Sequence, residues 1–453
     1  MSDPYSYNPK DIEEPPATIR GALRRVGPGL LLTASIVGTG ELIATTRLGA
    51  EVGYVLLWAI ILSCVSKTLI QAVWGRYTIV TGETGLAAMN RVPGPRVRNV
   101  NWIVWAWGLM ILLSLSLIGA MFAGVAQVMT LLVPHVPVDV WVVVLTVVTL
   151  LVLLAGTYRH IEAASIWMVA IFTFMTVLAA GVLTGQPDYF SWGQVRQGLE
   201  LGLPEKGLLI AVAAFGITGV NSAELFSYPY WCVEKGYARF TGPRDASEAW
   251  HRRAAGWIRV MHCDIVVSMV IYTAATVAFY LLGAGVLHTL GQVPSGGETI
   301  QVLSSMYTET MGTFGLYVFY IGAIFALYST VFAGTAANSR IYADLVRLAG
   351  GFAAHDYAAR LRWQRVFVVL LTLVPCGIYF AIGELVLMVK IGGVVFTLML
   401  PVIGLAVLYL RYRRLPPELA PGAWTTLGLW LVTGVAAIAM SLLVLIQLGV
   451  LKS

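Results

Sequence analysis

Leu32-Thr33-Ala34-Ser35-Ile36-Val37-Gly38-Thr39-Gly40-Glu41-Leu42 is the stretch that decides how this chain folds, and its pattern returns in Phe215-Gly216-Ile217-Thr218-Gly219-Val220-Asn221-Ser222-Ala223-Glu224-Leu225. Each is an apolar run that glycines interrupt and that continues with a glutamate and a leucine. Glycine weakens a helix interior, and a bilayer tolerates unwound backbone only where it is buried in protein or lines a cavity. Two interruptions at corresponding places in two hydrophobic halves therefore indicate a transporter's substrate site. The alternative is that two glycine-rich helices simply pack closely through small residues.

The composition places the chain among membrane proteins. It has 453 residues, of which 58% are hydrophobic and 11% are charged, whereas soluble proteins carry about 25% charged residues. The net charge of +6 does not indicate a nucleic-acid partner, because the basic residues lie in short loops between apolar stretches. The four cysteines form no Cys-x-x-Cys pair, so neither a disulfide framework nor a zinc site is predicted. We see no hydrolase, kinase or nucleotide-binding motif. We therefore expect no enzyme, no cofactor and no obligate protein partner; the expected partners are the lipid bilayer and an ion or small-molecule substrate.

Eleven stretches are apolar enough to cross a bilayer, for which about 20 residues suffice. They lie near residues 26–48, 53–78, 101–132, 138–156, 160–184, 207–232, 257–285, 312–340, 364–382, 384–410 and 424–449. Lys and Arg collect in alternate loops, which predicts a plasma (inner) membrane protein with a cytoplasmic N-terminus and an external C-terminus.

The first five stretches can be laid over the next five when Glu41 is matched to Glu224. An odd number of helices per half inverts the second half, so we expect an all-α membrane protein with an inverted five-plus-five repeat and one additional helix, in which helices 1 and 6 are broken. The predicted units are a disordered cytoplasmic tail (1–19), the first repeat (20–188), the second repeat (203–411) and the eleventh helix (420–453).

Several segments around these breaks resemble one known family. They are Gly27-Pro28-Gly29-Leu30-Leu31, Leu48-Gly49-Ala50, Leu56-Leu57-Trp58 with Gln71 and Arg76, Thr81-Gly82, Ile321-Gly322-Ala323 to Ala333-Gly334, and Asp264 early in the seventh stretch. The family that they resemble is the Nramp (natural resistance-associated macrophage protein) family of metal-ion transporters. The resemblance covers the first ten stretches and implies a leucine-transporter-type fold, in which helices 1, 2, 6 and 7 rock against a scaffold.

The family's metal ligands are not present by identity. Its first break carries Asp-Pro-Gly-Asn, where this chain has Gly38-Thr39-Gly40-Glu41, and its sixth helix carries Met-Pro-His, where this chain has Val220-Asn221-Ser222. Tyr328 matches the family's glutamine on the eighth helix. The chain therefore resembles a divergent, Nramp-related branch, and the fold alone does not define its substrate. The glycine turn is also similar to that of amino-acid transporters with this fold, which implies backbone amides that hold a substrate carboxylate.

Glu41 and Glu224 are the central candidates for substrate binding, although each begins a half-helix and could simply cap it. An ionisable group at the bilayer centre costs at least ~2.5 kcal/mol. A neighbouring pair of glutamates therefore implies a neutralising divalent cation, protons or the amine of a substrate. The tentative metal ligands are the oxygen atoms of Glu41, Glu224 and Asn221, with Ser222, Thr39 and the carbonyls near Gly38 and Gly219. Such oxygen donors suit magnesium or manganese. For an organic substrate, room beside the backbone would come from Gly38, Gly40 and Gly219.

Five further polar residues lie within the predicted membrane helices. Lys67, Lys390, Asp264 and Gln127 are candidates for coupling or gating, and Tyr328 is a candidate substrate contact. Each has a structural alternative, because buried lysines pair or reach the interface, end-of-helix carboxylates can be solvated, and amides and hydroxyls often bond between helices.

Together these features predict a proton- or cation-coupled symporter of a hard divalent metal ion. The first alternative is a carrier of a small polar organic compound, such as an amino acid or an amine, that moves no metal. The second is a membrane sensor or channel without coupled transport.

Overall fold

The computed structural model describes residues 4–6, 9–155, 158–204, 208–245 and 247–448, which are almost entirely helical. Among them, seven helices are long and apolar enough to cross a membrane, or eight if one bent pair is counted as a single span. These seven are α4 (Leu57–Thr81), α6 (Trp102–Leu132), α13 (Glu248–Leu282), α14 (Thr299–Leu348), α15 (Tyr357–Ile382), α16 (Leu385–Arg413) and α17 (Ala423–Gln447).

Each of the eleven expected stretches coincides with a helix or a helix pair, but eleven spans remain a prediction. The shorter elements are α2 (Pro28–Ile36), η2 (Thr39–Thr45), α3 (Thr46–Val52), α7 (Val138–Leu154), α8 (Tyr158–Leu183), α10 (Leu208–Ile217) and α11 (Ser222–Lys235). Most of these are short because the chain leaves the helical conformation near the middle of the first and sixth stretches.

Both breaks have a local backbone cause. Pro28 starts α2 at its first turn, where a missing N–H costs nothing. Gly38 then leaves the helical region, with φ −134° and ψ −122°, and the axis bends by 44° between Pro28–Ile36 and Gly40–Val52. In the sixth stretch Gly219 has a φ of +66°, which glycine adopts without strain, and Asn221 then caps α11. The expected pair of broken helices is therefore present.

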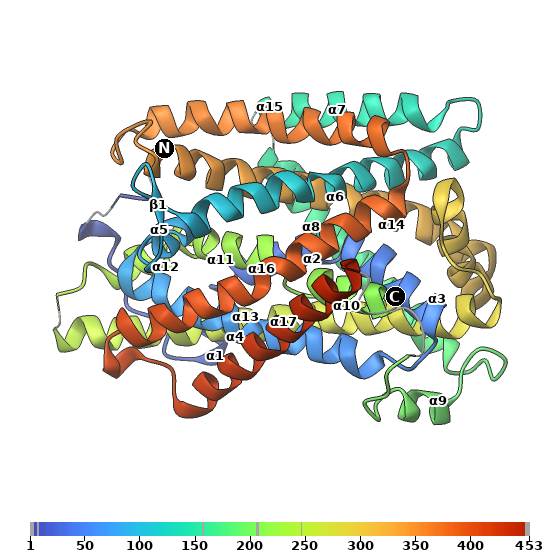
Figure 1. The fold of residues 1–453 in the computed structure, drawn as a ribbon, viewed down its shortest axis with the longest axis horizontal. Coiled ribbons are helices and arrows are strands. Elements are labelled where there is room, and N and C mark those ends of the chain that lie inside the picture. Colours follow the sequence, from blue (N-terminus) through green and yellow to red (C-terminus); the bar gives the residue numbers. More distant parts are fainter. Residues whose placement is uncertain (1–3, 7–8, 156–157, 205–207, 246, 449–453) are drawn as a thin grey trace.

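The helices run side by side along the horizontal direction of Figure 1. Close contacts join α6 to α16 and α14 to α6, α8 and α15, while α13 packs against α4 and α2. Small residues permit the closest crossings: a Cβ on Gly216 of α10 would lie 2.5 Å from the carbonyl oxygen of Gly393 in α16. α14 itself is interrupted at Gly312, where φ is 64° and ψ is −155°.

Short elements occupy the two ends of the bundle. α1 (Ile19–Leu23), α5 (Gly85–Asn90), α12 (Tyr237–Thr241) and β1 (Arg96–Val97), which pairs with β2 (Val100–Asn101), lie at the left end of Figure 1, and α9 (Trp192–Gln197) lies at the right end. The remaining short helices are η1 (Pro9–Asp11), η3 (Gly283–Leu287), η4 (Gly296–Glu298) and η5 (Pro417–Leu419).

The N-terminal segment makes more contacts than the expected disordered tail would. The Glu13 N–H donates to the Phe240 carbonyl at 3.1 Å, and the Glu13 carbonyl accepts a 3.0 Å bond from the Trp257 indole. The Glu13 carboxylate also forms a 2.7 Å ion pair with Arg25. The described part of the tail is thus held against α12 and the start of α13. The expected domain boundaries themselves stay predictions.

Candidate functional site

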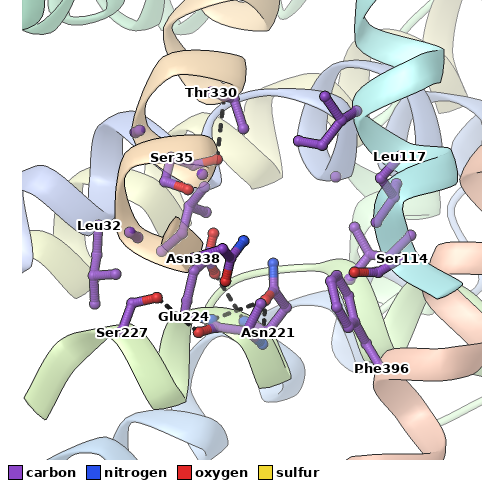
Figure 2. A pocket seen from close by; sticks show the side chains of 18 of the residues that line it. Leu32, Ser35, Ser114, Leu117, Asn221, Glu224, Ser227, Thr330, Asn338 and Phe396 are labelled. Carbon is purple, nitrogen blue, oxygen red and sulfur yellow. Dashed lines mark hydrogen bonds between the residues drawn. The ribbon is translucent and has the colours of Figure 1, made fainter. Parts of the chain in front are cut away.

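A cavity lies where the two broken helices meet (Figure 2). Residues of α2, η2, α6, α10, α11, α14 and α16 line it, and it contains about 840 Å³ of empty space, including the part that is open to solvent. Figure 2 shows Ser35, Asn338, Glu224 and Ser227 on one side and Leu117 with Phe396 on the other. Most of the remaining wall is apolar and includes Leu31, Ile36, Leu115, Ile118, Met121 and Ile217.

Glu224 lines this cavity and also caps its own helix. The Asn221 side-chain oxygen accepts bonds from the N–H groups of Ala223 at 2.9 Å and Glu224 at 3.1 Å. In return, Oε2 of Glu224 accepts the Asn221 N–H at 2.9 Å, which completes a capping box. The Ser35 side chain of α2 lies close to the same carboxylate. The structural alternative and the functional one are therefore compatible for Glu224, whereas the amide oxygen of Asn221 is already occupied.

Glu41 does not line the cavity but holds the break of the sixth stretch. It is fully buried, and its Oε1 accepts the Gly219 N–H at 3.0 Å and the Thr276 hydroxyl at 3.3 Å. Its Oε2 has no hydrogen-bond partner among the described residues. Glu41 therefore acts on the backbone of its partner helix rather than facing the same space as Glu224.

Lys67 binds the opposite side of the peptide unit whose N–H donates to Glu41. Its fully buried ammonium donates to the carbonyl of Thr218 and, at 2.7 Å, to that of Phe215. The Thr218 carbonyl and the Gly219 N–H belong to one peptide group, so a cation binds its oxygen while a carboxylate binds its hydrogen. We call this arrangement of Glu41, the Thr218–Gly219 peptide and Lys67 the peptide clamp. Lys67 interacts electrostatically with both Glu41 and Glu224, and the two carboxylates leave one negative charge in excess when all three groups are ionised.

The first break is held by neutral groups instead. The Thr330 hydroxyl of α14 donates to the Ser35 carbonyl at 3.2 Å, as the dashed line in Figure 2 shows. A side chain of a neighbouring helix thus satisfies a carbonyl at the end of α2, as Lys67 does at the end of α10. Unpaired backbone groups are costly inside a bilayer, so these side chains make both breaks tolerable.

A chain of contacts leads from one wall of the cavity to the N-terminal segment. Trp231 lines the cavity, and the guanidinium of Arg340 lies 5.3 Å from its ring centroid. Arg340 forms a 3.0 Å ion pair with Glu234, which accepts the Tyr5 hydroxyl at 2.7 Å. Burial and the neighbouring Glu234 raise the pKa of Tyr5 well above its ordinary value. These contacts connect the cavity wall at Trp231 to the N-terminal segment.

Asp264 joins two helices away from the cavity. Its carboxylate is fully buried and accepts the N–H groups of Gly27 at 2.8 Å and Gly29 at 2.6 Å, together with the Tyr228 hydroxyl at 3.1 Å. It therefore anchors the start of α2 to α13 and α11. The alternative of a solvated charge does not match this burial.

The other predicted residues are dispersed. Lys390 lines a separate small cavity with Arg47. Gln127 accepts the Ile300 N–H at 3.3 Å, and Ser222 donates to the Phe396 carbonyl at 2.7 Å. Tyr328 donates to the Leu145 carbonyl at 3.1 Å and accepts the Thr149 hydroxyl at 2.9 Å. These contacts match the alternative of interhelical hydrogen bonding for Gln127, Ser222 and Tyr328.

The glycines of the two breaks serve close packing. Gly40 lines the cavity, a Cβ on Gly38 would collide with the Thr330 hydroxyl, and one on Gly219 would lie 3.0 Å from the Cα of Cys64. The side chain of Thr39 lies outside the described part of the structure.

Sequence reasoning missed Asn338, Ser35 and Thr330 as wall residues. Asn338 lines the cavity beside Glu224, and its Oδ1 is buried without a partner among the described residues. In the sequence, Asn338 is a polar amide near the end of the apolar eighth stretch, and this position could have marked it as a candidate. The described residues contain no group of three His, Cys, Asp or Glu side chains placed to hold a metal ion. Any ion in the cavity would therefore be held by one carboxylate with amide, hydroxyl and water oxygens.

Comparisons with known proteins agree with this architecture. The family profile described as natural resistance-associated macrophage protein-like matches residues 29–447. The divalent metal cation transporter MntH of Pediococcus pentosaceus is 30% identical over 164 residues, covering 36% of this chain and 35% of that protein. The chain thus spans about a third of the length of that relative. MntH of Bacillus subtilis is 24% identical over 439 residues, covering 94% of this chain and 93% of that protein.

Solved structures give the same result for the fold. A mutant of the Eremococcus coleocola manganese transporter superposes with a TM-score of 0.68 at 18% identity, covering 98% of this chain and 90% of that chain. This likeness shows the fold alone, which is the leucine-transporter-type fold expected from the sequence. Because the family profile matches nearly the whole chain, the chain belongs to the natural resistance-associated macrophage protein-like (Nramp) family of membrane transporters.

Proposed function

We propose that this chain is a secondary active transporter that carries a hard divalent cation of the magnesium or manganese class through the cavity beside Glu224. The observation that carries the proposal is a carboxylate that faces a cavity between two broken helices, next to the amide oxygen of Asn338, for which the described part of the chain supplies no partner. The named relatives are divalent metal cation transporters, which supports the same class of cargo.

The donor set suits an ion that keeps part of its water. Magnesium dehydrates reluctantly and is often held by one or two carboxylates with several waters. Glu224, Asn338, Ser35 and Ser227 supply oxygen donors on one side of the cavity, and the space opposite leaves room for a water shell. When Glu41, Glu224 and Lys67 are all ionised, their one excess negative charge favours a cation there. Soft metals would gain little, since thiolate and imidazole ligands are their preferred partners.

Uptake into liposomes tests the proposal. We expect purified protein to take up Mn²⁺ or Mg²⁺, and we expect an imposed proton or cation gradient to drive that uptake. Glu224→Gln should reduce uptake at least tenfold, because the amide loses the charge that attracts the ion. Glu384→Gln is the matched control, since Glu384 lies at the N-terminus of a helix, as Glu224 does, but is exposed. A folded wild type without divalent uptake, or a Glu224→Gln variant with full uptake, would contradict the proposal.

The second candidate is a carrier of a small organic cation. The apolar wall, which includes Leu117, Met121 and Phe396, favours this cargo. In that case the amine would pair with Glu224 and the carbon skeleton would pack against the apolar wall. A thermal-shift screen of divalent salts against amines and amino acids separates the two candidates, because a ligand that binds the folded state raises its melting temperature.

A further inference from the structure

Lys67 is a buried cation that has no contact with the proposed cargo cavity. It extends from α4, which is continuous, to the end of α10, which is broken. Its Nζ donates to the carbonyls of Phe215 and Thr218 and lies 5.2 Å from the centroid of the Phe215 ring. The Ser63 hydroxyl, one turn earlier on α4, approaches the same two carbonyls at 3.2 Å each.

These atoms make up the environment of a monovalent cation. In transporters with broken helices, unwound carbonyls and the C-terminal ends of half-helices coordinate sodium or a proton. The C-terminal end of a helix also carries a partial negative charge. At the end of α10 two carbonyls and one hydroxyl surround a single positive charge, and that charge is the ammonium of the protein itself.

The related end of the first broken helix gives an internal comparison. There the Ser35 carbonyl is bonded by the neutral hydroxyl of Thr330, and the neighbouring space is the cavity. Among the described residues of the two breaks, a cation and a nearby buried carboxylate come together at the second one, where Glu41 binds the adjacent Gly219 N–H. The charged and titratable groups that face Lys67 are Glu41 and Glu224, with the thiol of Cys64 beside them.

We propose that Lys67 is a resident cation, which occupies the place of a sodium ion at the break of the sixth stretch and makes cargo binding independent of sodium. Because the ammonium is tethered to α4, it cannot leave with the cargo. Lys67 is thus a positioning residue that holds the backbone of the break in place. Its ammonium takes the role of a sodium ion, so the transporter needs no sodium at this position. The inference does not depend on the identity of the cargo.

The test measures sodium binding without any cargo. The melting temperature of the purified full chain is compared in NaCl and in choline chloride at equal ionic strength, since choline is too large for the space that an ammonium leaves. The wild type should melt at the same temperature in both salts. Lys67→Ala, which opens that space beside two carbonyls and the Ser63 hydroxyl, should melt about 2 °C or more higher in NaCl.

Lys390→Ala is the control, because it also removes a lysine from a membrane helix, but from a different cavity. It should respond to both salts alike. A sodium-specific stabilisation of the wild type would overturn the proposal, and so would a folded Lys67→Ala variant that does not respond to sodium. If Lys67→Ala does not fold, Lys67→Ser replaces it, and the wild-type measurement still refutes the proposal if sodium stabilises that protein. A failed metal-uptake experiment leaves these outcomes unchanged.

Discussion

Replacing Lys67 by methionine removes the ammonium from the peptide clamp and keeps a side chain of similar length. Two hydrogen bonds from a charged donor are lost, those to Phe215 and Thr218. Each such bond contributes about 1.5–3 kcal/mol, so their loss should cost ~3–6 kcal/mol of unfolding free energy. The substitution also removes the positive charge that interacts electrostatically with Glu41 and Glu224, so the loss should lie toward the upper end of that range.

Glu41→Gln removes the negative charge of the peptide clamp, whereas Lys67→Met removes the positive one. Glutamine keeps an acceptor for the Gly219 N–H but loses the charge, and it removes one of the two carboxylates that interact electrostatically with the Lys67 ammonium. The variant with both substitutions lacks the Glu41 carboxylate as well as the Lys67 ammonium, and of the three groups only Glu224 keeps a carboxylate. We therefore expect it to lose less stability than the two single variants together, with a coupling of about 1–3 kcal/mol.

Denaturant unfolding in detergent micelles measures this cycle, with melting temperatures as a second readout. The matched control pairs Glu41→Gln with Lys390→Met, which should be additive because Lys390 lines another cavity. Additivity of Glu41→Gln and Lys67→Met to within about 0.5 kcal/mol would show that the two side chains do not act on one peptide unit.

Three further predictions concern the parts that hold the cavity in place. Asp264→Asn loses one of its two backbone amide bonds to α2 and should lower the unfolding free energy by about 1.5–3 kcal/mol; an unchanged denaturation midpoint would contradict the anchoring role. Tyr5→Phe removes the bond to Glu234, so amide hydrogen exchange in the tail should become faster, with Tyr317→Phe on the exposed side of α14 as the control. Because folding raises the pKa of Tyr5, the stabilisation by this contact should be complete below a pH of about 10 and should be lost, in wild type only, as the pH rises further through the raised pKa. Gly49→Ala places a Cβ 2.6 Å from a backbone oxygen of α13. The melting temperature should therefore fall, because overpacking costs about 1–3 kcal/mol. An equal or higher melting temperature would mean that α3 and α13 can move apart without cost.

Much of the architecture could be predicted because its causes are local. Gly38 and Gly219 interrupt apolar runs, and the structure breaks both helices at these glycines. The capping role of Glu224 was also foreseeable, since Asn221 precedes it by three residues, the spacing of a capping box. The number of spans was harder to test, because a broken helix no longer meets the length that a crossing segment needs.

The candidate site was predicted less well, since its contacts join residues that are far apart in the chain. Tyr328 was expected at the substrate and instead bonds to Thr149 and Leu145 on α7, because the rotation of α14 about its axis depends on how its neighbours pack. Asn338 lines the cavity, where Tyr328 was expected. Nothing in the sequence around Asn338 distinguishes it from an amide that bonds between helices. Glu41 and Glu224 were expected to face one space, but only Glu224 lines the cavity.

What the sequence determined by itself is the membrane environment, the two broken helices and the acidic residue that follows each break. Hydropathy, glycine and helix capping act within a few residues, so they can be read along the chain. Only the tertiary structure decided which groups satisfy the freed backbone, because Lys67 is about 150 residues from the carbonyls that it binds. A bilayer offers no water to those carbonyls, so the hydrogen-bond donor must come from a neighbouring helix, and the tertiary packing decides which helix that is.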